Sequence, residues 1–204
     1  MIRRCALAVS LLGAALALAA TAVHAAPPSK TPPPKVDVRV ARLGPAGCGP
    51  FTDSLPPLVI ERVGEPGSTT PVVEVCVANR GTAHGRLTMT AADAVDREVD
   101  CSPDEATVDD TCTIGDLGDL SGTVEQLATV DPRCSKPPRS RAVSLQAPFT
   151  ALPEDPLVLH DSLHPQQVIC VGLRLLYQPA TFDDQVRAQS DVLTWRYAFD
   201  LRAP

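Results

Sequence analysis

The sequence predicts an all-β fold: a single antiparallel β-sandwich, jelly-roll-like or immunoglobulin-like, with a disulfide-restrained acidic excursion. Three observations carry this prediction. Apolar and polar side chains alternate along much of the chain. Twenty-one prolines and 12 glycines interrupt the alternating runs, and no segment keeps a helical stripe for more than about two turns. Roughly seven to nine short strands joined by such turns favour two antiparallel sheets packed face to face.

The N-terminus of the 204-residue chain is typical of a secretory signal, with Arg3 and Arg4 before an apolar run that ends in small residues. We expect cleavage after Ala25, which makes residues 1–25 the signal peptide. Residues 26–35, APPSKTPPPK, favour extended conformation and form a predicted proline-rich spacer. The sandwich domain is then predicted for residues 36–204. We expect a secreted, extracellular protein that either stays at the cell wall or diffuses away.

Charge and hydropathy exclude several classes of partner. Loss of Arg3 and Arg4 with the signal takes the formal net charge from −6 to −8. A negative surface disfavours nucleic acid and anionic lipid, which are best bound by clustered Lys and Arg. No later apolar run approaches the roughly 18 residues of a membrane helix, so we predict no transmembrane segment in the mature chain.

The first predicted strand covers residues 36–43, where valine alternates with polar or small residues. The last covers residues 193–202 and places Leu193, Trp195 and Tyr197 on one face. Because aromatic residues make up only 3% of the chain, we expect a core of Val and Leu with Trp195 as its largest single side chain. Further strands are predicted at residues 58–63, 73–78, 85–91, 124–130, 142–146, 157–160 and 167–177.

Six cysteines remain once Cys5 leaves with the signal, and an even number in an exported chain indicates disulfides. The sequence does not fix their pairing. We expect Cys101 and Cys112 to close a short local loop, and Cys76 and Cys170, both on predicted strands, to cross-link the core. The six predicted disulfide cysteines are Cys48, Cys76, Cys101, Cys112, Cys134 and Cys170.

The acidic excursion, residues 93–138, has many acids and few large apolar residues. We interpret it as a solvated charged surface restrained by disulfides, with one short helical turn around Glu105. As an alternative, its acids offer oxygen ligands to calcium, although the order of residues in an EF-hand loop is missing. The candidate calcium ligands are Asp104, Glu105, Asp109 and Asp110.

Residues 160–164, HDSLH, have the spacing of the HExxH zinc-peptidase signature. That signature needs a helix, which brings residues four apart onto one face. Pro165 disfavours helical geometry at His164, and strand-like residues flank the motif. We therefore interpret HDSLH as a turn between two strands. The alternative is a metal-dependent peptidase that uses His160, Asp161 and His164.

Other catalytic motifs are missing from the sequence: there is no Gly-x-Ser-x-Gly nucleophile motif and no glycine-rich phosphate loop. We therefore predict a protein that is not an enzyme and needs no cofactor.

Several short segments resemble the TasA/camelysin family of secreted bacterial proteins. They are VANRG (77–81), GRLT (85–88), CSPDE (101–105), DTC (110–112), IGDL (114–117) and QSDVLTW (189–195). The resemblance implies a jelly-roll-like sandwich in the extracellular matrix or at the cell surface, sometimes assembled into fibres by donation of an N-terminal strand. Camelysin itself is classed as a metalloprotease. This chain departs from the family in its six cysteines and its proline-rich spacer.

These observations favour a non-enzymatic exported β-sandwich that acts by protein contact or self-association. Strand addition is the predicted mode of association, with residues 36–43 as the donor, because this alternating segment follows a spacer and suits pairing with an open sheet edge. A camelysin-like secreted peptidase and a calcium- or carbohydrate-binding sandwich are the alternatives.

Overall fold

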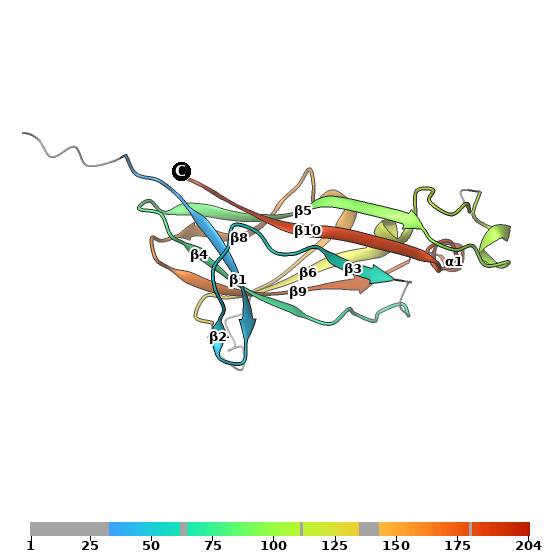
Figure 1. Cartoon of the computed structure of the whole chain (residues 1–204), viewed down its shortest axis with the longest axis horizontal. Coiled ribbons are helices and arrows are strands. Elements are labelled where there is room, and N and C mark those ends of the chain that lie inside the picture. The colour runs from blue at the N-terminus through green and yellow to red at the C-terminus, as the bar shows by residue number, and fades with distance from the viewer. Residues whose placement is uncertain (1–32, 62–64, 111, 135–142, 180) are drawn as a thin grey trace, which may run out of the picture. The chain divides into compact units, whose positions relative to one another are not determined.

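Within the described residues, ten strands form two antiparallel sheets that pack together (Figure 1). The computed structural model describes residues 33–61, 65–110, 112–134, 143–179 and 181–204. The predicted all-β sandwich is therefore confirmed. The predicted signal peptide (1–25) and most of the predicted spacer (26–35) lie outside the described residues.

The larger sheet has six strands. In spatial order they are β2 (Gly47–Cys48), β1 (Val38–Gly44), β4 (Val73–Asn79), β9 (Val168–Tyr177), β6 (Val124–Asp131) and β7 (Val143–Pro148). Strand β1, the predicted donor, pairs inside its own sheet with β4 and with the two-residue strand β2.

The smaller sheet has four strands, in the order β3 (Leu58–Glu61), β10 (Asp191–Arg202), β5 (Gly85–Glu98) and β8 (Leu157–Leu163). Short helices connect the strands of the two sheets. These are the 3₁₀ turns η1 (Glu105–Thr107), η2 (Leu120–Thr123) and η3 (Phe149–Ala151), and the α-helix α1 (Phe182–Arg187). No helix among these is long and apolar enough to cross a membrane.

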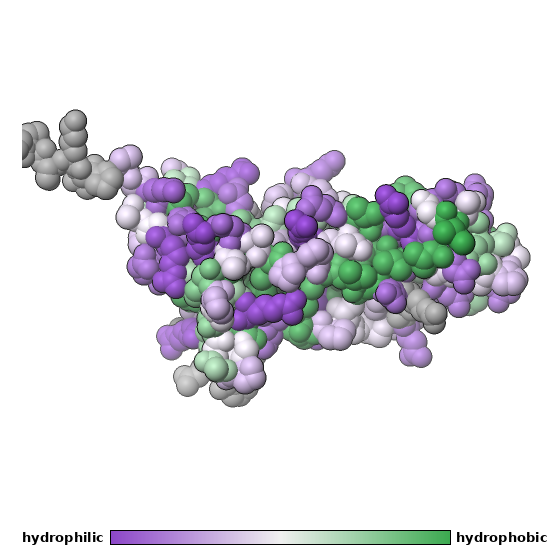
Figure 2. All heavy atoms as spheres, in the orientation of Figure 1, coloured by the Kyte–Doolittle hydropathy of each residue, from purple (hydrophilic) through white to green (hydrophobic). Residues whose placement is uncertain are grey.

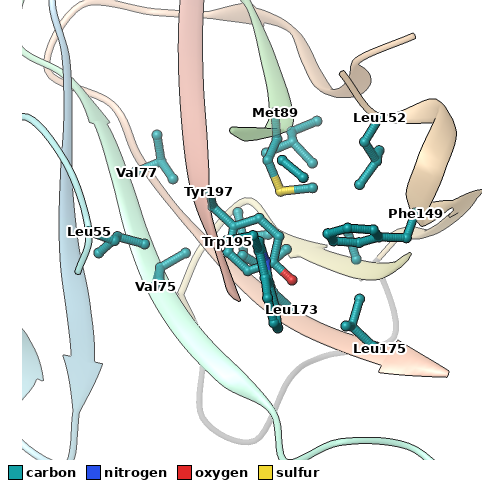
Figure 3. Close-up of a cluster of buried hydrophobic side chains, with 14 of the residues drawn as sticks. Leu55, Val75, Val77, Met89, Phe149, Leu152, Leu173, Leu175, Trp195 and Tyr197 are labelled. Atoms are coloured by element: carbon teal, nitrogen blue, oxygen red, sulfur yellow. The ribbon is translucent and has the colours of Figure 1, made fainter. Parts of the chain in front are cut away.

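The hydrophobic core lies between the two sheets and centres on Trp195, as the period-two pattern predicts (Figure 3). Trp195 is 3% exposed and packs edge to face against Phe149 and Tyr197, with ring centroids 5.6 and 5.9 Å apart. The buried Tyr197 hydroxyl donates a 2.6 Å hydrogen bond to Gln126 Oε1, so its polar end is satisfied inside the core.

Strand β5 extends well beyond the predicted end at Ala91 and changes the face that it buries. Up to Ala91, every second residue from Gly85 points into the core. Beyond it, Asp96 and Glu98 point inward, while Val95 is 43% exposed. The face of β5 that points into the core is therefore apolar up to Ala91 and acidic at Asp96 and Glu98.

A β-bulge at Asp93 causes this change. On β10, Thr194 pairs with Val95 and Arg196 with Ala92, so two steps on β10 match three on β5. One extra residue in a strand reverses the faces of all residues after it. Asp93 has a φ of 53°, a left-handed conformation in which Asp is several-fold enriched among non-glycine residues.

Three disulfides link the six cysteines of the described residues, an arrangement typical of an oxidising compartment. The predicted Cys101–Cys112 pair is confirmed. The predicted Cys76–Cys170 pair is wrong. These two residues are cross-strand neighbours with sulfur atoms 3.9 Å apart, but Cys76 is bonded to Cys48 and Cys170 to Cys134. The two bridges thus attach segments outside β4 and β9 to the sheet. A Cys76–Cys170 bond would add little restraint, because β4 and β9 are already paired by backbone hydrogen bonds.

Candidate functional site

Buried carboxylates converge where β5 ends and β10 begins. Asp96, Glu98 and Asp191 are 7%, 2% and 0% exposed. Asp191 lies directly opposite Glu98 in the β5–β10 pair, and Asp96 follows on the same face. The chain between β5 and β6, residues 99–123, lies at the end of the sandwich that α1 also occupies (Figure 1). We call residues 99–123 the acidic loop.

The acidic loop contributes two further buried acids, Glu105 and Asp109, which are 0% and 7% exposed. Glu105 begins η1, which confirms the predicted helical turn, and Asp109 follows two residues after its end; the Asp109 N–H donates to the Glu105 carbonyl at 2.8 Å. The Glu105 carboxylate accepts 3.2 Å hydrogen bonds from the Ser102 N–H and the Ser190 N–H. It therefore joins the loop to the residue just before β10.

Backbone N–H groups of the loop fold around the strand carboxylates. Asp191 Oδ2 accepts hydrogen bonds from the Asp119 and Leu120 N–H groups at 2.6 and 2.9 Å. Asp96 Oδ2 accepts one from the Ser121 N–H at 2.5 Å. These hydrogen bonds hold the loop backbone at residues 119–121 against the strand carboxylates, beside Leu120, which is itself buried in the core.

The second oxygen of each aspartate is buried without a hydrogen-bond partner among the described residues: Asp96 Oδ1 and Asp191 Oδ1. Both lie beside Gly118. A Cβ atom at position 118 would be 2.6 Å from Asp96 Oδ1 and 2.7 Å from Asp191 Oδ1. The two oxygens therefore pack directly against the Gly118 backbone, at a position where a side chain would collide with both.

The electrostatics of the site follow from burial of like charges. The pKa of Asp191 is raised to about 7, chiefly by burial; the nearby Asp96 and Glu98 contribute to the increase, and the N–H groups of Asp119 and Leu120 oppose it. Burial also raises the pKa of Asp96 and of Glu98. Ionised carboxylates inside a protein are costly unless a positive charge or sufficient N–H donors compensate them.

The sequence-predicted calcium ligands divide into two pairs. Asp104 and Asp110 are exposed, as the interpretation of a solvated surface requires. That interpretation is wrong for Glu105 and Asp109, which are buried. Asp96, Glu98 and Asp191 are not among the candidate residues predicted from the sequence. Alternation along the last strand could have identified Asp191, because it shares the face of Leu193 and Trp195. Alternation does not reveal that Asp96 and Glu98 point inward, because the bulge at Asp93 reverses the faces of the residues after it.

The HDSLH segment is a strand end, so its interpretation as a turn is wrong, although it is not helical either. Residues 157–163 form β8, and the turn begins at His164, where the Gln167 N–H donates to the His164 carbonyl at 3.1 Å. Strand β8 is longer than predicted because it continues to pair with β5 as far as Gly85.

The two histidines do not share a metal-binding geometry. Residues four apart along an extended chain are separated by about 13 Å. The half-buried His160 accepts a 3.1 Å hydrogen bond at Nδ1 from the Ser162 N–H, and burial lowers its pKa. Asp161 is exposed and lies 3.9 Å from Arg86. In the described part of the chain, neither histidine belongs to a group of three His, Cys, Asp or Glu ligand atoms within 4.8 Å of one another.

The outer face of the smaller sheet carries exposed apolar residues next to the acidic loop. Val59 and Val95, which are 54% and 43% exposed, flank Thr194 in one row across β3, β10 and β5. Figure 2 shows hydrophobic surface gathered over β3 and the adjacent part of β10.

The next row on this face contains Glu61, Val192, Arg97 and Leu117, paired in that order. Leu117 is 77% exposed. We call Val59, Val95, Leu117, Val192 and Thr194 the apolar patch. In its second row an acid and a base lie on opposite sides of Val192.

Comparison with known proteins gave no further guide: no protein-family model matches the chain, and no curated protein matches it.

Proposed function

We propose that this chain is a non-enzymatic exported β-sandwich of the cell surface or extracellular matrix that acts by protein contact, through self-association of the apolar patch. The observation that carries the proposal is the exposure of three aliphatic side chains, Val59, Val95 and Leu117, together on one sheet face. Contiguous exposed apolar surface is typical of interaction sites. Export is supported by the signal-like N-terminus and the three disulfides.

Charge placement favours a second copy as the partner. Glu61 and Arg97 flank Val192 in one row. A two-fold axis through the centre of the patch brings Glu61 of one copy opposite Arg97 of the other, and such self-complementarity characterises isologous dimers. The facing charges would offset each other at an interface whose centre is apolar.

Strand donation by residues 36–43 stays a prediction, and the patch is our preferred contact surface. Strand β1 has five register pairs with β4, from Val38 with Asn79 to Arg42 with Val75. The Cys48–Cys76 disulfide ties the β1–β2 hairpin covalently to β4. Both features oppose release of β1 to another subunit.

Sedimentation velocity over a wide concentration range tests the self-association. We expect Val59→Glu and Val95→Glu to shift the protein toward monomer. Val72→Glu is the matched control, because Val72 is 52% exposed but lies outside the patch. A wild-type protein that is monomeric at every concentration would contradict the proposal.

A charge exchange tests the two-fold arrangement. Glu61→Arg alone and Arg97→Glu alone should each weaken the dimer, because like charges would then face each other. The double variant should recover association. If the double variant is weaker than both single variants, the copies do not meet in this orientation.

A further inference from the structure

Four of the six disulfide cysteines lie together on the face of the larger sheet that points away from the core. Cys76 of β4 and Cys170 of β9 are directly opposite each other, and their sulfur atoms are 3.9 Å apart although no bond joins them. Cys76 is bonded to Cys48, and Cys170 to Cys134. The sulfur of Cys48 also lies within 4.8 Å of both inner sulfurs. We call these four residues the cysteine cluster.

Burial divides the cysteine cluster into an inner and an outer pair. Cys76 and Cys170 are 0% and 7% exposed and pack against Ala41 of β1. Cys48 is exposed, and the half-buried Cys134 lines a surface hollow of about 240 Å³ together with Cys170. A thiol from solvent therefore has its easiest approach to the outer sulfur of each bridge, and the inner sulfur is then the one that leaves.

The leaving inner sulfur would be a buried thiolate with a disulfide beside it. A thiolate inside a protein is costly, because it is an ion without water around it. The Cys170 sulfur, 3.9 Å from that of Cys76, is within reach of attack. A Cys76–Cys170 bond then forms, the Cys134–Cys170 bond breaks, and its electron pair leaves on Cys134. The negative charge thereby passes from a buried sulfur to one at the surface.

We propose that the cysteine cluster is a thiol–disulfide exchange site. One dithiol reductant converts its two bridges into a single Cys76–Cys170 bridge with free thiols at Cys48 and Cys134. The first thiol of the reductant attacks Cys48 to form a mixed disulfide, and the second displaces Cys48 as the reductant itself becomes a disulfide. The dithiol thus supplies two electrons and two protons, and the protein loses one disulfide in total. Attack on Cys134 gives the same product, because the Cys170 thiolate then attacks Cys76 and releases Cys48.

The strand pairing prepares the product bond. Directly opposite residues of an antiparallel pair have Cβ atoms about 4.5 to 5.5 Å apart, close to the roughly 3.5 to 4.5 Å of a disulfide. The bridge between Cys76 and Cys170 therefore needs only a small local adjustment of β4 and β9. The loop bridge provides the contrast. Among the described residues, Cys101 and Cys112 group with Glu105 and not with a third cysteine, so reduction there opens the loop without exchange.

Exchange would release two surface segments and keep the sheet closed. The Cys48–Cys76 bridge ties the β1–β2 hairpin to β4, and the Cys134–Cys170 bridge ties the turn after β6 to β9. After exchange, non-covalent contacts alone hold both segments, while β4 and β9 are joined covalently. The site goes beyond the proposed self-association and is independent of it, because the apolar patch lies on the smaller sheet.

The first experiment uses the purified, folded wild-type chain and dithiothreitol, which is added in steps until a cysteine of the cluster first becomes free. Excess N-ethylmaleimide at mildly acidic pH stops exchange and labels free thiols, and unreduced peptides are identified by mass spectrometry. We expect label on Cys48 and Cys134, together with a linked Cys76–Cys170 peptide pair. Label on Cys76 or Cys170 without the linked pair would overturn the proposal.

Single variants test the exchange without a reductant. Cys48→Ser leaves Cys76 without its partner, and exchange should move the free thiol to Cys134. Cys134→Ser should likewise move the free thiol to Cys48. Cys101→Ser is the matched control, and its free thiol should stay on Cys112. A free thiol that stays on the former partner in both cluster variants, as in the control, would show that no exchange occurs. The wild-type experiment decides the question even if a variant does not fold.

Hydrogen exchange measures the structural consequence. In the exchanged protein, amide exchange should accelerate in β2 and in residues 132–134 and remain slow in β4 and β9. Equal acceleration in β4 and β9 would show that reduction opens the sheet itself, which contradicts the proposal. Failure of the exchange would leave the self-association proposal unaffected, because the patch variants are read out by sedimentation and retain all six cysteines.

Discussion

The two halves of the inter-sheet core are built by the same two strands but are held together differently. Around Trp195, β5 and β10 contribute apolar side chains that pack against Phe149 and Tyr197. Around Asp191, the same strands contribute carboxylates that accept hydrogen bonds from loop N–H groups. The apolar half needs only close packing, whereas the acidic half needs a loop of fixed conformation.

This difference teaches that one sheet face can change its chemistry within a few residues. Burial of apolar surface is non-directional and tolerates small shifts. A buried carboxylate requires donors at defined positions, and each donor that is missing costs free energy. We therefore expect the apolar half to determine global stability and the acidic half to respond to pH and to restraint of the loop.

Trp195→Ala should give the largest loss, about 3 to 5 kcal/mol in the free energy of unfolding, because it removes the largest buried side chain and leaves a cavity. Urea denaturation monitored by circular dichroism measures it. A melting temperature within a degree or two of the parent would show that the apolar half does not control stability.

Removal of the loop disulfide with Cys101→Ser and Cys112→Ser should cost less, about 2 to 3 kcal/mol, since the bridge closes a short loop. The effect should be local. Hydrogen exchange should accelerate in residues 99–123 and remain slow in β4 and β9. Equal acceleration of exchange in residues 99–123 and in β4 and β9 would show that the acidic and apolar halves of the core unfold together.

The pH dependence should have a smaller effect. The pKa of Asp191 is about 7 in the folded chain, against an ordinary value of 3.8. A raised pKa means that the folded state holds a proton that the unfolded chain loses first, so stability decreases as pH rises from about 4 through 7. Thermal melts should show this decrease, and Asp191→Asn should flatten it. A wild-type stability that increases over this range relative to the variant would contradict the assignment.

Substitution of the exposed loop acids should have the smallest effect. Asp104→Asn and Asp110→Asn, each alone, should change the free energy of unfolding by less than about 0.5 kcal/mol, because both side chains face solvent. Thermal melts at neutral pH are sufficient to check this. A loss above 1 kcal/mol, about twice that limit, would place these acids in the stabilising network.

The sandwich could be predicted from the sequence because alternation is a local property. Trp195 and Tyr197 show their shared face within a few residues, and the short turn at Glu105 was also predicted correctly. The acidic site depends on long-range pairing. Whether Asp96 faces inward is set by the bulge at Asp93 and by pairing with a strand about 100 residues later.

The predictions that the structure contradicts failed for the same physical reason, because they depend on long-range pairing. Cys76 and Cys170 do lie side by side, but their bonds go to Cys48 and Cys134, which only the folded chain brings over the sheet. HDSLH looked like a turn because Pro165 follows it, whereas pairing of β8 with β5 keeps the segment extended up to Leu163.

Because of the bulge at Asp93, the number of residues in this part of β5 determines which side chains face the core, whatever those side chains are. Deletion of one residue there would restore a simple alternation, turning Val95 and Arg97 inward and Asp96 and Glu98 toward solvent. That single change would exchange the interior and exterior of the strand end and dismantle both the patch and the carboxylate cluster. Among homologues of this protein, insertions and deletions near residue 93 should therefore be rarer than substitutions.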